Sequence, residues 1–182
     1  MSEISTYAIA IAGGIFPALA WLWFWLKEDS RHPEPRRLIA LAFLAGMLTV
    51  VVVIPIQKFV AGYLVTQTAI FAAWSTIEEF TKYIIAWIVV LHRRENDEPI
   101  DAVIYMVAVA LGFAGLENAL FLLSPLAGDT VAQTIVTGNL RFIGATLLHV
   151  FSSALVGIAL AFSFYKPILI REWYAAVGVI LA

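Results

Sequence analysis

The sequence predicts an all-α fold in which a bundle of helices crosses a membrane several times, and three observations support this. Hydrophobic residues make up 62% of the 182 residues and charged residues only 13%, whereas soluble domains have about 45–50% and about 25%. The mean hydropathy is +0.92. Five apolar segments each reach the roughly 20 residues that a membrane-spanning helix needs. We therefore expect a polytopic transmembrane helical bundle of five full helices plus a truncated sixth.

The expected helices follow one another with short loops between them. The first covers about residues 7–26, and because no basic residue precedes it, it is predicted to stay in the protein rather than act as a cleaved signal peptide. The next four cover about residues 38–64, 68–91, 100–123 and 139–165. A sixth begins near Trp173 and is too short at Ala182 to span a bilayer. We expect a single domain over residues 1–182 that is cut within its last helix.

Net charge and cysteine content exclude several classes of function. The formal net charge is −2 and the chain has no cysteine. Nucleic-acid binding needs a concentration of positive charge, which this chain lacks. Disulfides, thiol catalysis, iron–sulfur clusters and Cys-ligated zinc all need cysteine. The expected partners are the lipid bilayer and a membrane protein or peptide, with no nucleic acid.

The positions of the basic residues predict how the chain is oriented. Eight of the eleven Lys and Arg residues lie in three alternate loops, namely Lys27, Arg31, Arg36, Arg37, Arg93, Arg94, Lys166 and Arg171. Cytoplasmic loops of membrane proteins carry an excess of Lys and Arg. We therefore expect these three loops in the cytoplasm and the N-terminus outside.

Six ionisable side chains fall within the expected helices: Glu78, Glu79, Lys82, Glu117, Arg141 and His149. Each costs about 2.5–3.5 kcal/mol near the centre of a bilayer, so such residues usually serve a function. Glu78 and Lys82 are four residues apart, which puts them on one helix face where they are expected to pair. We expect Glu78, Glu79, Glu117 and His149 to line one polar cavity in the outer half of the membrane.

Two kinds of chemistry fit carboxylates and an imidazole at a common depth. Such groups activate water, either as a general base with an orienting partner or as ligands of a metal ion. The same residues also serve as a proton relay in transporters. The spacing alone leaves both open: a hydrolase, or a proton-coupled membrane transporter that uses the buried Glu and His residues.

Three short motifs carry a resemblance to a known family. Glu78-Glu79-Phe-Thr-Lys82 has the pattern EExxK, Phe113-Ala-Gly-Leu-Glu117-Asn118 has the pattern FxxxEN, and His149-Val-Phe-Ser-Ser153 has the pattern HxxxS. In this order and on three successive helices, they resemble the PrsW-type intramembrane proteases of the CAAX-protease and bacteriocin-immunity superfamily. The resemblance covers about residues 16–165.

The resemblance implies an intramembrane endopeptidase, usually classed as a metallopeptidase, in a prokaryotic plasma membrane. Family members are known for site-1 cleavage of anti-sigma factors. Carried over to this chain, the resemblance implies catalytic roles for Glu78, Glu79, Glu117 and His149. Our own interpretation makes Glu78 the general base for the attacking water. Lys82, Asn118 and Ser153 are supporting residues. Two alternatives remain open: Glu117 and His149 bind a divalent metal such as Zn²⁺, or they bind the water and the oxyanion directly.

Overall fold

The computed structural model describes residues 3–28, 33–128 and 131–182, without the side chains of residues 3, 4, 6, 28, 124–128 and 131–143. The described residues form six α-helices and no strand: α1 (Glu3–Glu28), α2 (Arg36–Ala61), α3 (Gln67–Ala86), α4 (Pro99–Gly128), α5 (Val131–Phe162) and α6 (Ile168–Leu181). A π-helical turn, η1 (Trp87–Leu91), continues α3. The predicted all-α bundle is confirmed.

Four helices are long and apolar enough to cross a membrane, which makes the chain an integral membrane protein. They are α1, α2, α4 and α5 among the residues described. The third predicted span, formed by α3 and η1, falls outside this group because Glu78, Glu79 and Lys82 interrupt its apolar composition. The sixth helix begins at Ile168 rather than near Trp173, and its 14 residues are still too few to span.

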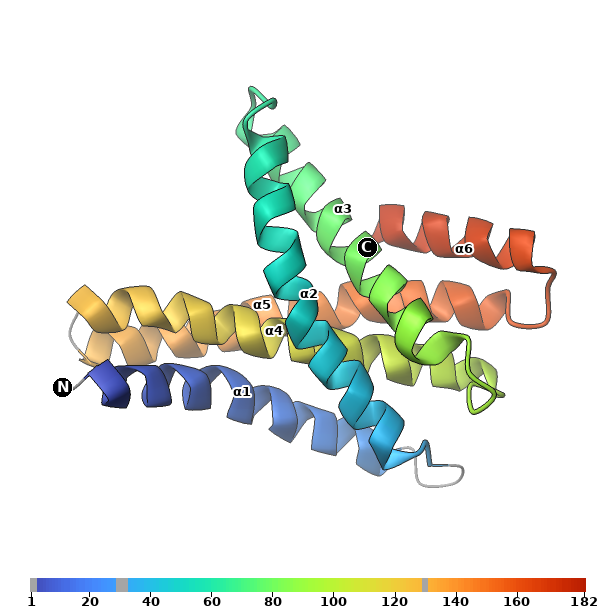
Figure 1. The fold of residues 1–182 in the computed structure, drawn as a ribbon, viewed down its shortest axis with the longest axis horizontal. Helices are drawn as coiled ribbons and strands as arrows, with labels where there is room; N and C mark the ends of the chain where they lie inside the picture. The colour runs from blue at the N-terminus through green and yellow to red at the C-terminus, as the bar shows by residue number, and fades with distance from the viewer. Residues whose placement is uncertain (1–2, 29–32, 129–130) are drawn as a thin grey trace.

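Helix α4 lies at the centre of the bundle and packs against α1, α2 and α5. In Figure 1, α1, α4 and α5 run alongside one another, while α2 and α3 form a hairpin that lies across them. Tyr105, Met106 and Leu111 of α4 are fully buried. A helix that is apolar on all sides is suited to this central position, and it brings Glu117 into the interior.

Two glycines allow α2 to cross α4 in direct backbone contact. A Cβ atom added at Gly46 would overlap the carbonyl oxygen of Val109, and one added at Gly112 would overlap that of Phe43. Small residues at helix crossings in membranes permit this close approach. The crossing lies about one and a half to two turns from Glu117, so it fixes the position of that carboxylate relative to α2.

The N-terminus of α4 is held by its own Asp101, which is 2% exposed. Its Oδ2 accepts hydrogen bonds from the backbone N–H groups of Asp97, at 2.9 Å, and Glu98, at 2.7 Å. These N–H groups lie where a helix start lacks backbone acceptors, so the carboxylate stabilises the helix end. Asp101 is thereby a structural residue.

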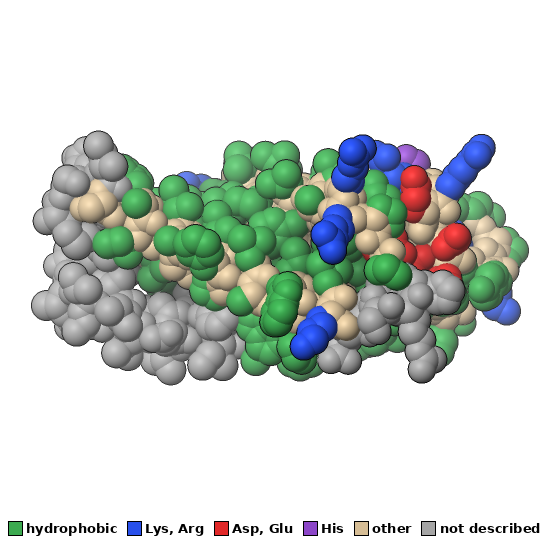
Figure 2. All heavy atoms as spheres, turned by 90° about the horizontal axis from the view of Figure 1, so that it is seen from below, with side chains coloured by type: hydrophobic (Ala, Val, Ile, Leu, Met, Phe, Trp, Pro, Cys, Tyr) green, Lys and Arg blue, Asp and Glu red, His purple; other side chains and the backbone are tan. Residues whose placement is uncertain are grey.

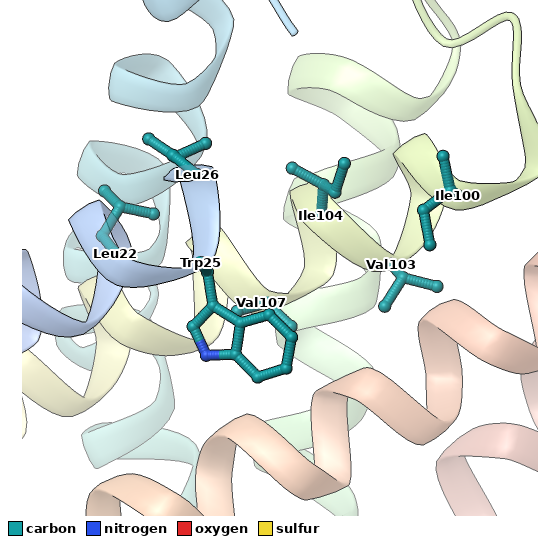
Figure 3. Close-up of a pocket in the computed structure, with 7 residues that line it drawn as sticks. All are labelled: Leu22, Trp25, Leu26, Ile100, Val103, Ile104 and Val107. Atoms are coloured by element: carbon teal, nitrogen blue, oxygen red, sulfur yellow. The ribbon is translucent and has the colours of Figure 1, made fainter. Parts of the chain in front are cut away.

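An apolar cavity of about 200 Å³ lies between α1 and the first half of α4 (Figure 3). Leu22, Trp25 and Leu26 contribute from α1, and four aliphatic residues contribute from α4. None of the lining side chains carries a carboxylate, imidazole or hydroxyl group. This cavity therefore offers no group for acid–base chemistry, and the candidate site lies elsewhere.

Candidate active site

His149 joins the three sequence motifs at one point. Its Nε2 atom lies 3.0 Å from Oε2 of Glu117 on α4, and its Nδ1 atom lies 2.9 Å from Nζ of Lys82 on α3. His149 itself is 7% exposed on α5. Three helices that are distant in the sequence thus meet through one imidazole ring.

Glu79 is fully occupied by neighbouring side chains. Its Oε1 lies 2.7 Å from Nζ of Lys82, and its Oε2 accepts a hydrogen bond of 2.6 Å from the hydroxyl group of Ser153. Lys82 and Ser153 are completely buried, and Glu79 is 3% exposed. The sequence predicted that Lys82 pairs with Glu78, whereas the partner that the structure shows is Glu79, three residues away.

Phe113 packs against the charged end of this network. The Nζ atom of Lys82 lies 4.2 Å from the centre of its ring, within the range of a cation–π contact. The same ring meets the His149 imidazole edge-on, with 5.0 Å between the ring centres. The phenylalanine of the FxxxEN motif therefore helps to hold Lys82 and His149 in place.

The hydrogen bonds around His149 have a defined direction. An ammonium group donates hydrogen bonds and cannot accept them, so Lys82 donates to Nδ1 of His149. The neutral ring then carries its proton on Nε2, which donates to the Glu117 carboxylate. These two contacts assign the Nε2–H tautomer to His149, and Glu117 is the acceptor of that N–H group.

Glu78 and Glu117 line a cavity of about 190 Å³ between α2, α3 and α4. Their side chains are 16% and 29% exposed, compared with 9% for that of His149. The rest of the lining is Gln57 and apolar residues, among them Val53 and Phe121. Of the four residues expected to line one cavity, Glu78 and Glu117 do so, whereas Glu79 and His149 lie beside it.

Gln57 belongs to the site, although no motif in the sequence indicated it. Its side-chain Nε2 donates a 2.7 Å hydrogen bond to Oε1 of Glu78. The other oxygen of Glu78 lies 3.9 Å from Nδ1 of His149, too far for a direct hydrogen bond. The signal that could have found Gln57 is a lone amide that follows an apolar stretch in the second predicted helix.

Asn118 lies next to the site without lining its cavity. Asn118 is 5% exposed, and its Nδ2 donates a 3.0 Å hydrogen bond to the hydroxyl oxygen of Thr146. This bond ties α4 to α5 one residue beyond Glu117, but Asn118 does not line the cavity. The side chain of Arg141 lies outside the described residues.

Comparisons with known proteins identify the family. The profile described as "PrsW family intramembrane metalloprotease" matches residues 34–182. The chain is 33% identical over 159 residues to Protease PrsW of Geobacillus kaustophilus and 30% identical over 155 residues to that of Bacillus subtilis, covering 86% and 84% of this chain. The matched parts are 65% and 66% of those relatives' lengths, just under two thirds. No solved structure matches. The chain belongs to the PrsW family of intramembrane metalloproteases.

The family description implies a metal ion, but the donor groups as arranged do not fit one. A histidine that binds a metal uses the lone pair of one ring nitrogen and gives the other N–H to an acceptor. Here Nδ1 faces the ammonium group of Lys82, and Nε2 carries the proton that goes to Glu117. No group of three His, Asp or Glu residues in the described part of the chain is arranged to hold a metal.

Proposed function

We propose that this chain is an intramembrane endopeptidase that hydrolyses peptide bonds of membrane proteins with water activated by Glu78. The observation that supports this most directly is the pair of carboxylates, Glu78 and Glu117, on one cavity, with His149 3.0 Å from Glu117. Family membership supports peptide-bond hydrolysis rather than proton-coupled transport as the use of these groups.

Glu78 is the general base in this mechanism. Gln57 holds one of its oxygens, which leaves the other to accept a proton from a water molecule in the cavity. As the water oxygen bonds to the carbonyl carbon of the substrate, its proton moves to Glu78. Glu78 then gives that proton to the departing amine as the carbon–nitrogen bond breaks, so the carboxylate returns to its starting state.

Glu117 acts on the attacking water, and His149 orients Glu117. The Nε2–H group of His149 donates to the Glu117 carboxylate and thereby holds that carboxylate in orientation. Glu117 also lines the cavity, where its carboxylate can accept a hydrogen bond from the attacking water.

Glu79, Lys82 and Ser153 are positioning residues. Both oxygens of Glu79 are occupied, so it has no free oxygen to accept a proton from water. Lys82 connects Glu79 to Nδ1 of His149 and thereby keeps the Nε2–H tautomer of the ring. We assign Glu79 to this supporting network rather than to proton transfer.

The proposed substrate is a single-pass membrane protein, such as an anti-sigma factor, cut on the outer side of the membrane. The last turns of α1, of η1 after α3, and of α5 all lie at one end of the bundle (Figure 1), and most of the basic residues follow these turns or lie in the helix ends beside them. By the positive-inside rule this end faces the cytoplasm. Single cysteines introduced at Glu95 and at Val65 test the orientation, because the chain has no other thiol: only Glu95→Cys should be labelled from the cytoplasm.

The function is tested by comparing Glu78→Gln with Glu95→Gln, a matched change on an exposed loop. Gln at position 78 can still accept the hydrogen bond from Gln57, but it cannot take a proton from water. General-base catalysis contributes about 10²–10⁴-fold, so cleavage of a panel of single-pass substrates in proteoliposomes should fall by that factor for Glu78→Gln only. Equal cleavage by both variants would contradict the assignment of the base. Proton flux without cleavage by the unmodified protein would favour a transporter.

A further inference from the structure

A second polar cavity, of about 310 Å³, lies at the end of the bundle where η1, the loop before α4 and the start of α6 meet. Arg93 and Arg171 contribute the positive charge of its lining, and Glu172 contributes the negative charge. It shares no lining residue with the cavity of Glu78 and Glu117. The proposed proteolysis gives it no role.

The charges around this cavity leave an excess of one positive charge. Two arginines face one carboxylate, and the Tyr83 hydroxyl donates a 2.6 Å hydrogen bond to Oε2 of that carboxylate, Glu172. His92, also in the lining, is neutral at pH 7 in the formal charge count. A ligand with a single negative charge, such as a phosphodiester, balances this excess.

Both arginines are held before any ligand binds. The Nε atom of Arg93 donates to the backbone carbonyl oxygen of Val89. The guanidinium group of Arg171 lies over the ring of Phe164, 5.4 Å from its centre. Side chains already held in this way lose less conformational freedom on binding than unattached ones, and arginine matches the geometry of phosphate oxygens.

The cavity lies at the end of the bundle, which we infer to lie where the membrane meets water. Trp87 and Ile168 line it and remain 46% and 59% exposed. Tryptophan is enriched at this depth of a membrane. In Figure 2 most of the Lys, Arg, Asp and Glu side chains on the visible face gather toward one end, whereas hydrophobic side chains cover the middle. The lining of the cavity therefore combines arginines with apolar side chains.

We propose that this cavity binds the phosphate headgroup of an anionic phospholipid, with its acyl chains along the apolar surface that Trp87 and Ile168 begin. The phosphodiester oxygens accept hydrogen bonds from Arg93 and Arg171. A zwitterionic lipid brings an ammonium group as well, so its net charge does not match the excess positive charge. Basic pockets between transmembrane helices bind anionic headgroups in the same way.

Native mass spectrometry of the full chain in detergent tests the proposal. The protein is titrated with phosphatidylglycerol or with phosphatidylcholine of the same acyl chains. We expect phosphatidylglycerol to bind at least about fivefold more tightly, and Arg93→Gln or Arg171→Gln each to weaken its binding about fivefold, in line with the contribution of one basic residue near anionic lipid. Arg94→Gln and Lys166→Gln are the matched controls, because neither residue lines the cavity.

Three outcomes would overturn the proposal. The first is equal affinity for the two lipids. The second is that Arg94→Gln lowers the affinity for phosphatidylglycerol as much as Arg93→Gln does. This would indicate that the overall positive charge of the protein attracts the lipid. The third is competition by millimolar inorganic phosphate that removes all bound lipid, since this would identify a site for free phosphate instead. Tryptophan fluorescence on heating checks that each variant is folded.

Discussion

Two consecutive residues of α3 serve two different polar regions. Lys82 points its ammonium group into the network of Glu79 and His149, while Tyr83 donates to Glu172 at the cavity near the bundle end. Lys82 is completely buried, whereas Arg93 and Glu172 in the second region are exposed. The two regions therefore differ in how their charges are compensated.

Burial explains this difference. A charge removed from water must be matched by a nearby opposite charge and by hydrogen bonds, or it destabilises the fold strongly. In the active-site network Glu79 and Lys82 satisfy each other, and Ser153 occupies the remaining oxygen. At the bundle end water screens the charges, so an excess positive charge is tolerated and remains available for a ligand. The active-site network holds catalytic side chains in place, whereas the cavity at the bundle end has the charge that we propose binds an anionic headgroup.

The largest effect on stability is expected for Lys82→Met. Removal of one partner from a buried ion pair leaves the other charge uncompensated, which costs about 3–5 kcal/mol. Glu79 is 3% exposed, so water cannot compensate its charge. Thermal unfolding in detergent, followed by tryptophan fluorescence, should show a large decrease in melting temperature.

Lys58→Met is the matched control for this prediction. Lys58 lies in the last turn of α2 and is exposed, so its loss should change the free energy of unfolding little. If the two variants unfold at the same temperature, the Glu79–Lys82 pair is not the buried centre of the network. Where Lys82→Met remains folded, we expect it to retain more activity than Glu78→Gln, because Lys82 acts only through its neighbours.

The sequence predicted the helices and the meeting of three motifs, because helical spacing and hydropathy are local properties. It predicted Glu78 as the partner of Lys82, whereas the structure pairs Lys82 with Glu79. Residues three and four positions away both lie on the same side of a helix, so α3 alone leaves the choice open. Ser153 of α5 engages Glu79, and Gln57 of α2 engages Glu78. The choice therefore depends on other helices.

The cavity at the bundle end was not predicted for a similar reason. The sequence places Arg93 and Arg171 in predicted loops and so assigns them to the orientation of the chain, whereas Arg171 lies in α6. Their common cavity depends on how η1 and the start of α6 pack together, and 78 positions separate the two residues in the sequence (171 − 93). No pattern of spacing within one helix reports such a contact.

A smaller effect on stability is expected for Tyr83→Phe. The change removes the hydrogen bond to Glu172 that ties α3 to α6. Because Glu172 is exposed and water can replace the lost donor, the expected cost is about 1 kcal/mol, near that of an ordinary hydrogen bond. Chemical denaturation should detect it. A loss as large as that of Lys82→Met would mean that the second region is as important to the fold as the first.

The smallest effect is expected from removal of metal ions. Nδ1 of His149 accepts from Lys82 and Nε2 donates to Glu117, so neither nitrogen offers a lone pair to a metal ion. Dialysis of the purified protein against a chelator should therefore change the rate of substrate cleavage by less than about twofold. An enzyme that needs a metal ion would instead lose its activity when the ion is chelated. Zn²⁺ added back should not increase the rate. Loss of cleavage on chelation and its recovery with Zn²⁺ would require Lys82 to leave His149, and the Lys82→Met variant would then bind Zn²⁺ more tightly than the unmodified protein.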